Sequence, residues 1–409
     1  MKFDTIIIGG GLCGLTAGIE LSRKGQKCLI ASSGQSALHF FSGSFELCSL
    51  SENPYEAMAS FDESHPYSRI GLARLRELAA EVKPFFKEAG ITLKGTDDAN
   101  HWRITPLGLL KRAWLTMDEY AVLPSDGKIP WKKAALLNIE GFLDFHPSYI
   151  AYGFSEMGVE TVTRTISTPE LERLRLNPTE MRSTNIAKTL TGDLIRVPAA
   201  RINEHAKDVD AIFMPAVVGL DGCSDLVRLK EHVDRPLHFL PTLPPSVPGI
   251  RLQLMLKRHF QKLGGTYMLG DSVTGGRFEE GRLKSIVTRN HGDFGFEADN
   301  FILASGSMFS KGIVSDMDTI REPVFGLDVD FRAGRSNWYD KNMFEAQPYM
   351  SFGVSVGKDF RVFRNGTMTD NLYAAGSVLS GFNALKEGSG AGISILTALH
   401  VSSLILNTP

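Results

Sequence analysis

The first part of the chain alternates apolar runs with a glycine-rich turn. An apolar run over residues 3–8 leads into three consecutive glycines, and an apolar-periodic stretch over about 12–24 ends at Gly25. A second apolar run covers residues 28–33. Short apolar runs bounded by glycine indicate buried strands, and glycine suits the left-handed residue that follows a helix. The pattern therefore predicts strand, glycine turn, helix and strand.

The middle of the chain shows a different alternation. Strand-like runs separated by helical patterns read "KAALLNI", "VETVTRTI", "AIFMPAVVG" and "PLHFLP". Strands that alternate with helices are typical of α/β domains with a parallel sheet. The segment over 240–249, "LPTLPPSVPG", contains four prolines and is predicted to be a stiff crossing between domains.

The last part returns to the opening arrangement. A helix is expected over about 249–263, followed by strands, a second strand–glycine segment in "NLYAAGSVLSG" and a final apolar helix. We therefore expect one discontinuous domain, residues 1–125 and 249–409, with small β insertions. An α/β domain over 126–248 is expected to be inserted into it.

Composition narrows the class of protein. The chain has 409 residues, 43% of them hydrophobic, with a net charge of −2, so nucleic-acid binding is not expected. Its four cysteines are scattered, which predicts a reducing compartment and no iron–sulfur or other metal site. No signal peptide or apolar run of about twenty residues is visible. The apolar stretch over 393–406 is interpreted as a buried core helix.

The glycine turn after the first strand has the spacing of a nucleotide-binding motif. Gly9 permits the tight turn, Gly11 lets backbone N–H groups approach a phosphate, and Gly14 allows the helix to pack on the strand. The phosphate then lies at the helix N-terminus, where the helix dipole favours negative charge by about 0.3–2 kcal/mol.

An acidic residue expected after the second strand is missing. Dinucleotide-binding proteins usually carry Asp or Glu there for the adenosine ribose, but this strand ends in Ser32 and Ser33. Three cofactors remain: NADP, for which no cation stands nearby; FAD, held by hydroxyls; and FMN, which has no adenosine ribose. FMN fits the residues most simply, with FAD as the alternative.

Further cofactor contacts are expected from small residues in both halves of the chain. Ser42-Gly43-Ser44 offers a flexible backbone against which a flat ring could lie, although it also fits a plain surface loop. The strand-to-glycine "FILASG" predicts a contact at Gly306. The strand that ends at Gly376 and Ser377, and the helix opened by "KEGSGAG" with Gly390, predict more, because a helix N-terminus stabilises an anionic ring.

Charged catalytic candidates are few. Arg251 and Arg321 could each bind a phosphate or carboxylate, with an ordinary salt bridge as the other reading. His291, in the predicted hairpin tip "TRNHGD", is the third candidate. His39 lies beside the serine–glycine loop and either bonds the ring or packs in the loop.

These segments resemble the flavoprotein superfamily of the fumarate reductase and succinate dehydrogenase type. Within it the chain is most similar to the family formed by the B subunit of anaerobic glycerol-3-phosphate dehydrogenase. The residues that carry the resemblance are "IIIGGGLCGLTAG", "GQSALHFFSGS", "RITPLG", "LPTLPPSVPGIRLQ", "TRNH", "FILASG", "REPVFGLDV" and "NLYAAGSVLSG". The resemblance implies a glutathione-reductase-like, Rossmann-type flavin-binding domain assembled from both chain ends, with the α/β insertion.

The resemblance also implies a function. In that family an FAD-bearing catalytic subunit and this FMN subunit oxidise sn-glycerol 3-phosphate to dihydroxyacetone phosphate in anaerobic respiration. A third, iron–sulfur subunit anchors them at the cytoplasmic side of the inner membrane and passes electrons to menaquinone, with fumarate or nitrate as the final acceptor. A covalent flavin in the superfamily often hangs on a histidine placed as His39 is.

One departure leaves alternatives open. Related FAD enzymes usually carry an acid where this chain has Ser377, which weakens the expected hold on the flavin. A structural subunit that bridges its partners, with a degenerate flavin site, therefore stays open as a second reading. A free-standing NAD(P)H oxidoreductase is the third, although no second nucleotide turn supports it.

Overall fold

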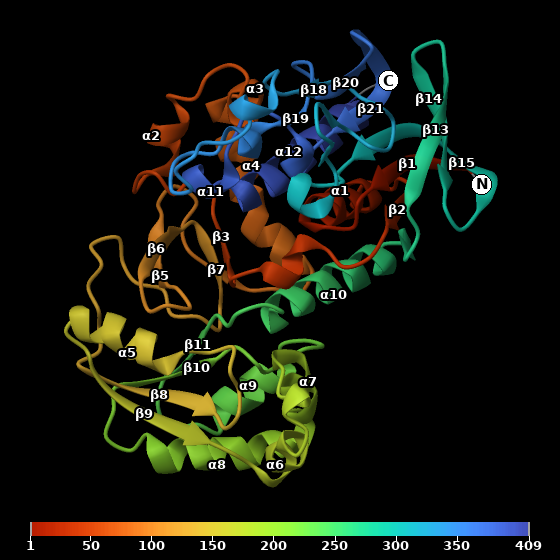
Figure 1. Ribbon diagram of the computed structural model, residues 1–409. Helices are drawn as coiled ribbons and strands as arrows, with labels where there is room; N and C mark the ends of the chain where they lie inside the picture. The colour runs from red at the N-terminus through yellow and green to blue at the C-terminus, as the bar shows by residue number, and fades with distance from the viewer. Residues whose placement is uncertain (1, 408–409) are drawn as a thin grey trace. The chain divides into compact units, whose positions relative to one another are not determined.

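The computed structural model describes residues 2–407 and divides into two compact units. The first unit consists of Met1–Ala37, Glu46–Phe85 and Leu256–Pro409, and the second of Leu38–Phe45 and Phe86–Met255. Figure 1 shows the chain coloured from the N-terminus to the C-terminus, with a separate sheet in each unit. Each unit is described by itself.

A mixed sheet forms the core of the first unit. Its order is β12-β2-β1-β15-β14-β13, and β21 pairs with β15 as well. Five of its strands are mutually parallel: β1 (Lys2–Ile8), β2 (Cys28–Ser32), β12 (Thr266–Leu269), β15 (Gly292–Leu303) and β21 (Thr367–Ala374). Strands from both ends of the chain thus lie side by side, as the sequence predicts.

Two long helices cover this sheet. α1 (Leu12–Arg23) packs on α12 (Gly390–Asn407), and both are largely buried. Gly25 follows α1 with a positive φ of 89°, as expected from the sequence. Among the described residues, α12 alone is long and apolar enough to cross a membrane, but 56% of its most apolar window is buried inside the protein. That burial agrees with the predicted core helix.

The remaining elements of the first unit either form the antiparallel part of the sheet (β13, β14 and β20) or lie around it. They are α2 (Pro54–Met58), α3 (Pro66–Ile70), α4 (Leu72–Glu88), β13 (Val273–Glu279), β14 (Arg282–Thr288), β16 (Val314–Ser315), β17 (Ile320–Arg321), β18 (Val329–Asp330), β19 (Gly353–Val354), β20 (Arg361–Arg364) and α11 (Ala384–Glu387). The chain passes into the second unit for residues 38–45, enters it again within α4, and returns within α10 (Val247–Lys262).

The second unit is built on a four-stranded parallel sheet. The strands β8 (Lys133–Ile139), β9 (Glu160–Ile166), β10 (Ala211–Pro215) and β11 (Leu237–Leu240) lie in the order β11-β10-β8-β9. Its helices are α5 (Pro147–Glu156), α6 (Pro169–Arg175), α7 (Ser183–Thr189), α8 (Arg196–His205) and α9 (Ser224–Glu231). Figure 1 shows α5 and α8 on opposite faces of this sheet. The predicted α/β alternation is confirmed.

The second unit extends beyond the predicted bounds of 126–248. Residues 38–45 and 86–125 also belong to this unit, in which they form small sheets of their own. One contains β3 (Ser44–Phe45), β7 (Leu115–Met117) and β4 (Leu93–Lys94); the other pairs β5 (His101–Ile104) with β6 (Leu110–Ala113). These pairings join residues far apart in sequence, which local patterns do not reveal.

The proline-rich segment over 240–249 is not a crossing between the units. Its backbone is bonded inside the second unit: the N–H of Leu243 donates to the carbonyl of Asp144, and the hydroxyl of Ser183 donates to that of Pro245. The boundary lies later, within α10. Prolines make the segment stiff, but these hydrogen bonds decide to which unit it belongs.

Candidate functional site

The carboxyl ends of the parallel strands in the first unit meet at one edge of the sheet. Ile8 of β1 is in register with Ala31 of β2 and with Leu303 of β15, and Leu303 is in register with Ala374 of β21. The four loops that follow these strands therefore begin side by side. In open α/β sheets this edge is where ligands bind.

Two glycines of the first turn are required by packing. Gly9 has a φ of +122°, and a Cβ there would lie 2.1 Å from the carbonyl oxygen of Ala304. A Cβ on Gly14 would lie 1.8 Å from the carbonyl oxygen of Gly9. Both distances are far inside van der Waals contact, so neither position accepts a side chain.

Gly11 is different, because its surroundings are open. A Cβ there would meet only the Cβ of Ser36, at 3.8 Å. Gly11 is also the N-cap of α1, where no side chain accepts the free N–H groups, and no acidic residue stands in the first turn. Uncapped helix N–H groups beside an open glycine fit a phosphate, so the turn has the features that a nucleotide cofactor needs.

The end of β2 carries no carboxylate, as the sequence indicates. Ser32 is buried and its hydroxyl donates to the carbonyl of Gly34 at 3.1 Å, whereas Ser33 is exposed. An acid that the sequence analysis did not single out, Asp271, follows the neighbouring strand β12, and its N–H donates to the carbonyl of Ser32. Both of its carboxylate oxygens are engaged, with the N–H of Asn290 and the ring of His291.

The later glycine segments reach the same edge. Gly306 follows β15 with a φ of +86°, and a Cβ on it would lie 3.8 Å from the hydroxyl of Ser377. Gly376 follows β21 with a φ of +77°; its N–H donates to Thr397 on α12 at 2.8 Å. A Cβ on Gly376 would lie 2.8 Å from the Cβ of Cys13, near the start of α1. The structure thus brings Gly306, Gly376 and Ser377 together beside the first turn.

Cys13 is not a reactive thiol in this position. Burial raises its pKa to about 12, although a hydrogen bond with Thr397 acts in the opposite direction. The thiolate is the nucleophilic form, so this cysteine packs rather than reacts. Gly390 opens α12, as expected, and a Cβ there would touch only Ala384, at 3.4 Å.

The serine–glycine segment belongs to the second unit. Ser44 lies in β3, opposite Thr116 of β7, and its hydroxyl accepts a hydrogen bond from Thr116 at 2.9 Å. Thr116 in turn lies 2.7 Å from Nε2 of His101. Gly43 has a φ of +86° and packs on the ring of Tyr120. Ser42 precedes them in the same loop and is partly exposed.

Arg251 lies in the second unit in a closed environment. Its side chain is fully buried, pairs with Glu119, and donates to the carbonyl oxygens of Val218 and Gly219 at 3.1 and 2.7 Å. These internal contacts to one guanidinium indicate a structural ion pair that ties α10 to the loop after β10. An arginine so engaged has little left to offer a substrate.

Arg321 and His291 lie in the first unit. Arg321 is exposed on β17, while its neighbour Glu322 is buried and accepts from the N–H groups of Val324 and Phe325. Burial raises the pKa of Glu322, and these hydrogen bonds oppose the rise. The carboxylate therefore organises the segment "REPVFGLDV", a role that its sequence position did not indicate.

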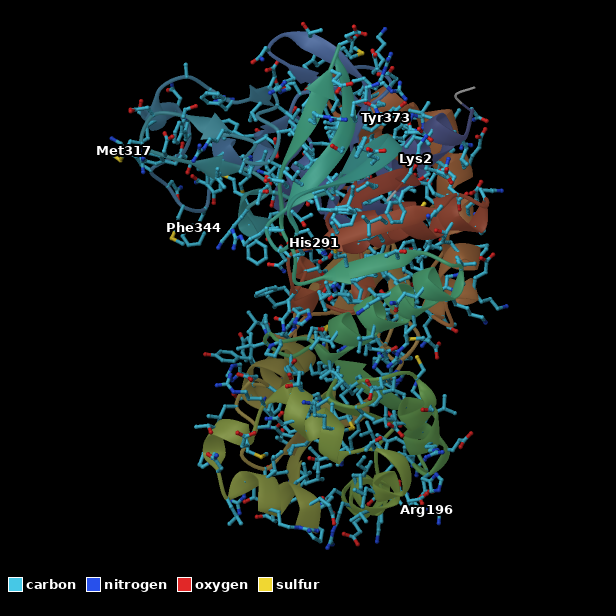
Figure 2. All side chains as sticks on the ribbon, turned by 90° about the vertical axis from the view of Figure 1, so that its right-hand side faces the viewer. Lys2, Arg196, His291, Met317, Phe344 and Tyr373 are labelled. Carbon is cyan, nitrogen blue, oxygen red and sulfur yellow. The ribbon has the colours of Figure 1, made fainter. Side chains whose placement is uncertain are left out.

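His291 occupies the turn between β14 and β15, as predicted, and Figure 2 labels it there. Its Nδ1 lies 2.7 Å from Asp271, and its side chain is 43% exposed. Burial disfavours the charge on Asp271, but hydrogen bonds from Thr288, Asn290 and His291 hold the pKa of that carboxyl below its usual value. The pair fixes the orientation of the imidazole ring.

His39 lies in the second unit, near the serine–glycine segment. Its carbonyl accepts from the N–H of Ser246, and burial lowers the pKa of its ring, opposed by a hydrogen bond with Gln253. The neutral ring is packed in the loop by these contacts.

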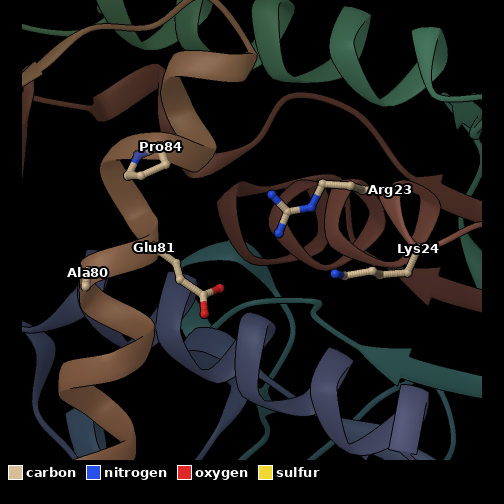
Figure 3. A pocket seen from close by; sticks show the side chains of 5 residues that line it. All are labelled: Arg23, Lys24, Ala80, Glu81 and Pro84. Atoms are coloured by element: carbon tan, nitrogen blue, oxygen red, sulfur yellow. The ribbon is translucent and has the colours of Figure 1, made fainter.

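A surface hollow in the first unit lies away from the glycine turn. Figure 3 shows Arg23 and Lys24, at the C-terminal end of α1, across from Glu81 on α4. Ala80 and Pro84 complete the lining. Since α1 rises about 1.5 Å per residue, the hollow is about 16 Å from the helix N-terminus. It is separate from the nucleotide edge.

Residues that the sequence analysis missed are Asp271, Glu119, Thr116, Tyr120 and His101. Asp271 was missed because the apolar pattern does not show that β12 ends at Leu269, two residues before it. The others lie in or beside strands that pair over a distance, β3 with β7 and β5 with β6, and no local sequence pattern predicts these pairings.

Comparison with known proteins identifies the family of the chain. A family model described as FAD binding domain matches residues 4–393. The B subunit of anaerobic glycerol-3-phosphate dehydrogenase from Yersinia pestis bv. Antiqua (strain Antiqua) is 40% identical over 418 residues, covering 100% of this chain and 99% of the relative. The B subunit of the same enzyme from Pectobacterium carotovorum is also 40% identical, covering 99% of each.

Among solved structures, glycine oxidase from Bacillus cereus has 11% identity and a TM-score of 0.36, covering 99% of this chain and 95% of that one. So low a TM-score carries no argument. The matched domain and the parallel sheet confirm the predicted fold class, a Rossmann-type flavin-binding domain assembled from both chain ends. The chain belongs to the family formed by the B subunit of anaerobic glycerol-3-phosphate dehydrogenase.

Proposed function

We propose that this chain is the flavin subunit of an anaerobic glycerol-3-phosphate dehydrogenase complex. In that role it takes part in the oxidation of sn-glycerol 3-phosphate to dihydroxyacetone phosphate and relays the electrons towards menaquinone. The observation that carries the proposal is the full-length 40% identity to the B subunit of that enzyme, together with an open, uncapped glycine turn at the nucleotide edge.

FMN is the flavin that we propose. The family model is named for FAD, but β2 ends at Ser32, which Ser33 follows, and the nearby Asp271 is engaged with other partners. The first glycine turn would hold the phosphate, through Gly11 and the first N–H groups of α1. The bound flavin would supply the two-electron chemistry; the chain's own groups bind and orient it.

The partners follow from the family. We propose an FAD-bearing catalytic subunit and an iron–sulfur membrane-anchor subunit, which would place this chain at the cytoplasmic side of the inner membrane through its partner. His291, with its ring oriented by Asp271, and the exposed Arg321 remain candidates for contacts to substrate. Arg251 is proposed as a structural group, because Glu119 and two carbonyls already occupy it.

A second candidate function is a bridging subunit that has lost tight flavin binding. The serines at 32, 33 and 377, where related proteins carry acids, favour it. Gly11→Asp separates the two readings, because the open space around Gly11 lets the variant fold while its charge opposes a phosphate. Loss of flavin and turnover with assembly intact would support the relay; unchanged turnover would refute it.

The direct test is the identity of the flavin. The chain is purified with its partners, separated in denaturant, and its released flavin is identified by chromatography and mass. FMN in near-equal amount to protein supports the proposal. FAD would mean that hydroxyls replace the missing carboxylate, and no flavin would favour the bridging subunit.

A further inference from the structure

Two stretches of the first unit are almost entirely exposed. All five residues of 315–319 and every residue of 330–346 except Trp338 are exposed. Their large apolar side chains are Met317, Phe331, Tyr339, Met343 and Phe344. Met343 is 77% exposed and Phe344 is 88% exposed, and Figure 2 labels Phe344 and Met317 at the surface. Bare methionine and aromatic side chains gathered in this way are typical of protein interfaces.

Hydrogen bonds within the loop fix the tip that carries Phe344. The side-chain oxygen of Gln347 accepts from the N–H of Asp340 at 2.9 Å, and its amide donates to two carbonyl oxygens of the loop at 3.0 and 3.2 Å. The N–H of Phe344 donates to the side chain of Asn342 at 3.1 Å. A loop that is already ordered loses less conformational freedom when a partner covers it.

Trp338 anchors the base of this loop and connects the two stretches. Its indole N–H donates to the carbonyl of Arg332 at 2.8 Å, and its own carbonyl accepts from the N–H of Tyr349 at 2.9 Å. Arg335 lies over the indole ring and donates to the carbonyl of Met317 at 3.4 Å. Residues 315–319 and 330–346 therefore form one surface, which we call the lobe surface.

The lobe surface has the extent of one side of a stable interface. Sixteen residues of 330–346 and all five of 315–319 are exposed. Specific protein interfaces use about 20–30 residues on each side, with aromatic and methionine anchors near the centre. The exposed residues are thus sufficient in number and kind for a specific protein partner.

The charge of the lobe surface opposes binding to a membrane. Its exposed charged side chains are five acids and three bases: Asp316, Asp318, Asp330, Asp340, Glu345, Arg332, Arg335 and Lys341. A lipid surface with anionic head groups attracts basic segments, so it does not favour this one. A protein whose apolar pocket is bordered by more basic than acidic residues is complementary to it.

Both ends of the segment that carries the lobe surface lie at the nucleotide edge of the first unit. The segment leaves that edge after Gly306 and returns at β19, where Val354 pairs with Leu379, shortly after Gly376. A Cβ on Gly353 would lie 2.4 Å from the carbonyl carbon of Leu379. A protein on the lobe surface therefore docks on a segment rooted in the cofactor edge, which suits a partner that exchanges electrons with the flavin.

We propose that the lobe surface is where the FAD-bearing catalytic subunit of the same complex docks, with Met343 and Phe344 inserted into an apolar pocket of that subunit. The inference rests on the proposed function. The catalytic subunit fits better than the membrane-anchor subunit, because an acidic surface is not attracted to the anionic leaflet at which an anchor lies. Docking would remove the two bare side chains from water.

Phe344→Ala is the first test. The full-length chain is titrated with the purified catalytic subunit, and the dissociation constant is measured by isothermal calorimetry. The variant should bind about tenfold more weakly or worse, since a buried aromatic anchor dominates an interface. Its melting temperature should not change, because the ring is 88% exposed. Leu176→Ala, 85% exposed at the end of α6 in the second unit, is the matched control and should change neither quantity.

Gln347→Ala tests the ordering of the tip. The variant loses the hydrogen bonds that hold the loop, so it should bind the catalytic subunit about fivefold more weakly. Added to Phe344→Ala, it should change the affinity almost no further, because Gln347 acts by positioning Phe344. Gln261→Ala, at an exposed glutamine of α10, is the control and should leave the affinity unchanged.

The outcomes separate the two proposals. A wild-type chain that does not bind the catalytic subunit refutes the proposed function and this inference with it. Wild-type affinity in Phe344→Ala overturns the inference alone. The choice of occupant is overturned if Phe344→Ala instead abolishes binding to the iron–sulfur subunit, binding to phosphatidylglycerol vesicles, or a dimer of this chain in sedimentation. Additive effects in the double variant overturn the positioning role of Gln347.

Discussion

Both units contain a parallel sheet, yet the carboxyl edges of the two sheets are built in opposite ways. In the first unit the edge opens on Gly11, where among the described residues a Cβ would meet only Ser36 at 3.8 Å and no side chain caps α1. In the second unit the loop after β10 is closed by Arg251, which donates to the carbonyls of Val218 and Gly219 and pairs with Glu119.

The difference shows that the topology of the sheet positions the loops, whereas the groups in the loops decide whether a ligand can bind. A parallel sheet brings loop ends together in either case, but only an edge with unsatisfied backbone groups has something to offer a ligand. At an edge filled by a buried ion pair, the polar groups of the loops already have partners inside the protein. Function at such an edge therefore depends on the groups that its own fold leaves free.

The largest effect on stability is expected when the buried ion pair at the edge of the second unit's sheet is broken. Arg251→Met should lower the free energy of unfolding by about 3–5 kcal/mol, because Glu119 is left as a buried charge without its partner. Urea denaturation measures it. Adding Glu119→Leu should recover much of the loss. A variant of normal stability that has lost substrate affinity would instead return Arg251 to the catalytic candidates.

At the edge of the first unit's sheet, Gly14 and Gly11 should differ in what they contribute, the first to stability and the second to flavin binding. Gly14→Ala should destabilise the chain by about 2–3 kcal/mol, since its Cβ would lie 1.8 Å from the carbonyl oxygen of Gly9. Gly11→Ala should leave the melting temperature nearly unchanged and weaken flavin binding. Equal stability losses in the two variants would mean that Gly11 also serves packing rather than the ligand.

Acid should affect the second unit through His238. Burial, followed by the charges of Lys94 and Lys230, lowers the pKa of its ring to about 4. The unfolded chain takes up a proton below about pH 6.5 and the folded chain does not, so stability falls as the pH drops from 6.5 towards 4. At pH 5 the loss relative to pH 7 is about 2 kcal/mol.

His238→Phe tests this assignment. The ring already lies against Phe213 and Trp131, so phenylalanine suits the same aromatic contacts without a titrating group. The variant should unfold in urea with a smaller difference between pH 7 and pH 5 than the wild type. An unchanged difference would show that His238 takes up a proton in the folded chain as readily as in the unfolded chain.

The smallest effect is expected where the open edge lacks its acid. Ser33→Asp adds a carboxylate after β2 at an exposed position, so its hydrogen bond to an adenosine ribose is worth about 1 kcal/mol. Binding of FAD should strengthen about fivefold and binding of FMN should not, both measured by fluorescence titration. Stronger binding of both would show that the adenosine part is not what residue 33 meets.

The fold was largely predictable because short stretches of sequence indicate most of its helices and strands. The apolar runs of β1 and β2, the periodic helix between them and the glycine that ends it are all short-range signals. The boundary between units was not, since it depends on the pairing of Ser44 with Thr116 and on hydrogen bonds such as that from Ser183 to Pro245. Such contacts join residues far apart along the chain.

The site divides in the same way. Gly9, Gly11 and Gly14 carry a motif whose spacing is its signal, and the structure places Gly306 and Gly376 at the same edge. The sequence offered no means to see that the arginine at 251 is sealed in an ion pair, because its partner Glu119 lies far away in the chain. The role of a charged residue depends on its neighbours in space, which the sequence does not show, whereas the role of a turn glycine is largely indicated by its position in the motif.

The pairing of β1 between β2 and β15 has a consequence for the synthesis of the protein. β1 leaves the ribosome before both of its neighbours, and the second of them, β15, ends only at Leu303. At about 5–20 residues per second the wait is roughly 15–60 seconds. During that time one side of an isoleucine-rich strand lacks its partner, so this edge is open to wrong pairing until β15 has been made.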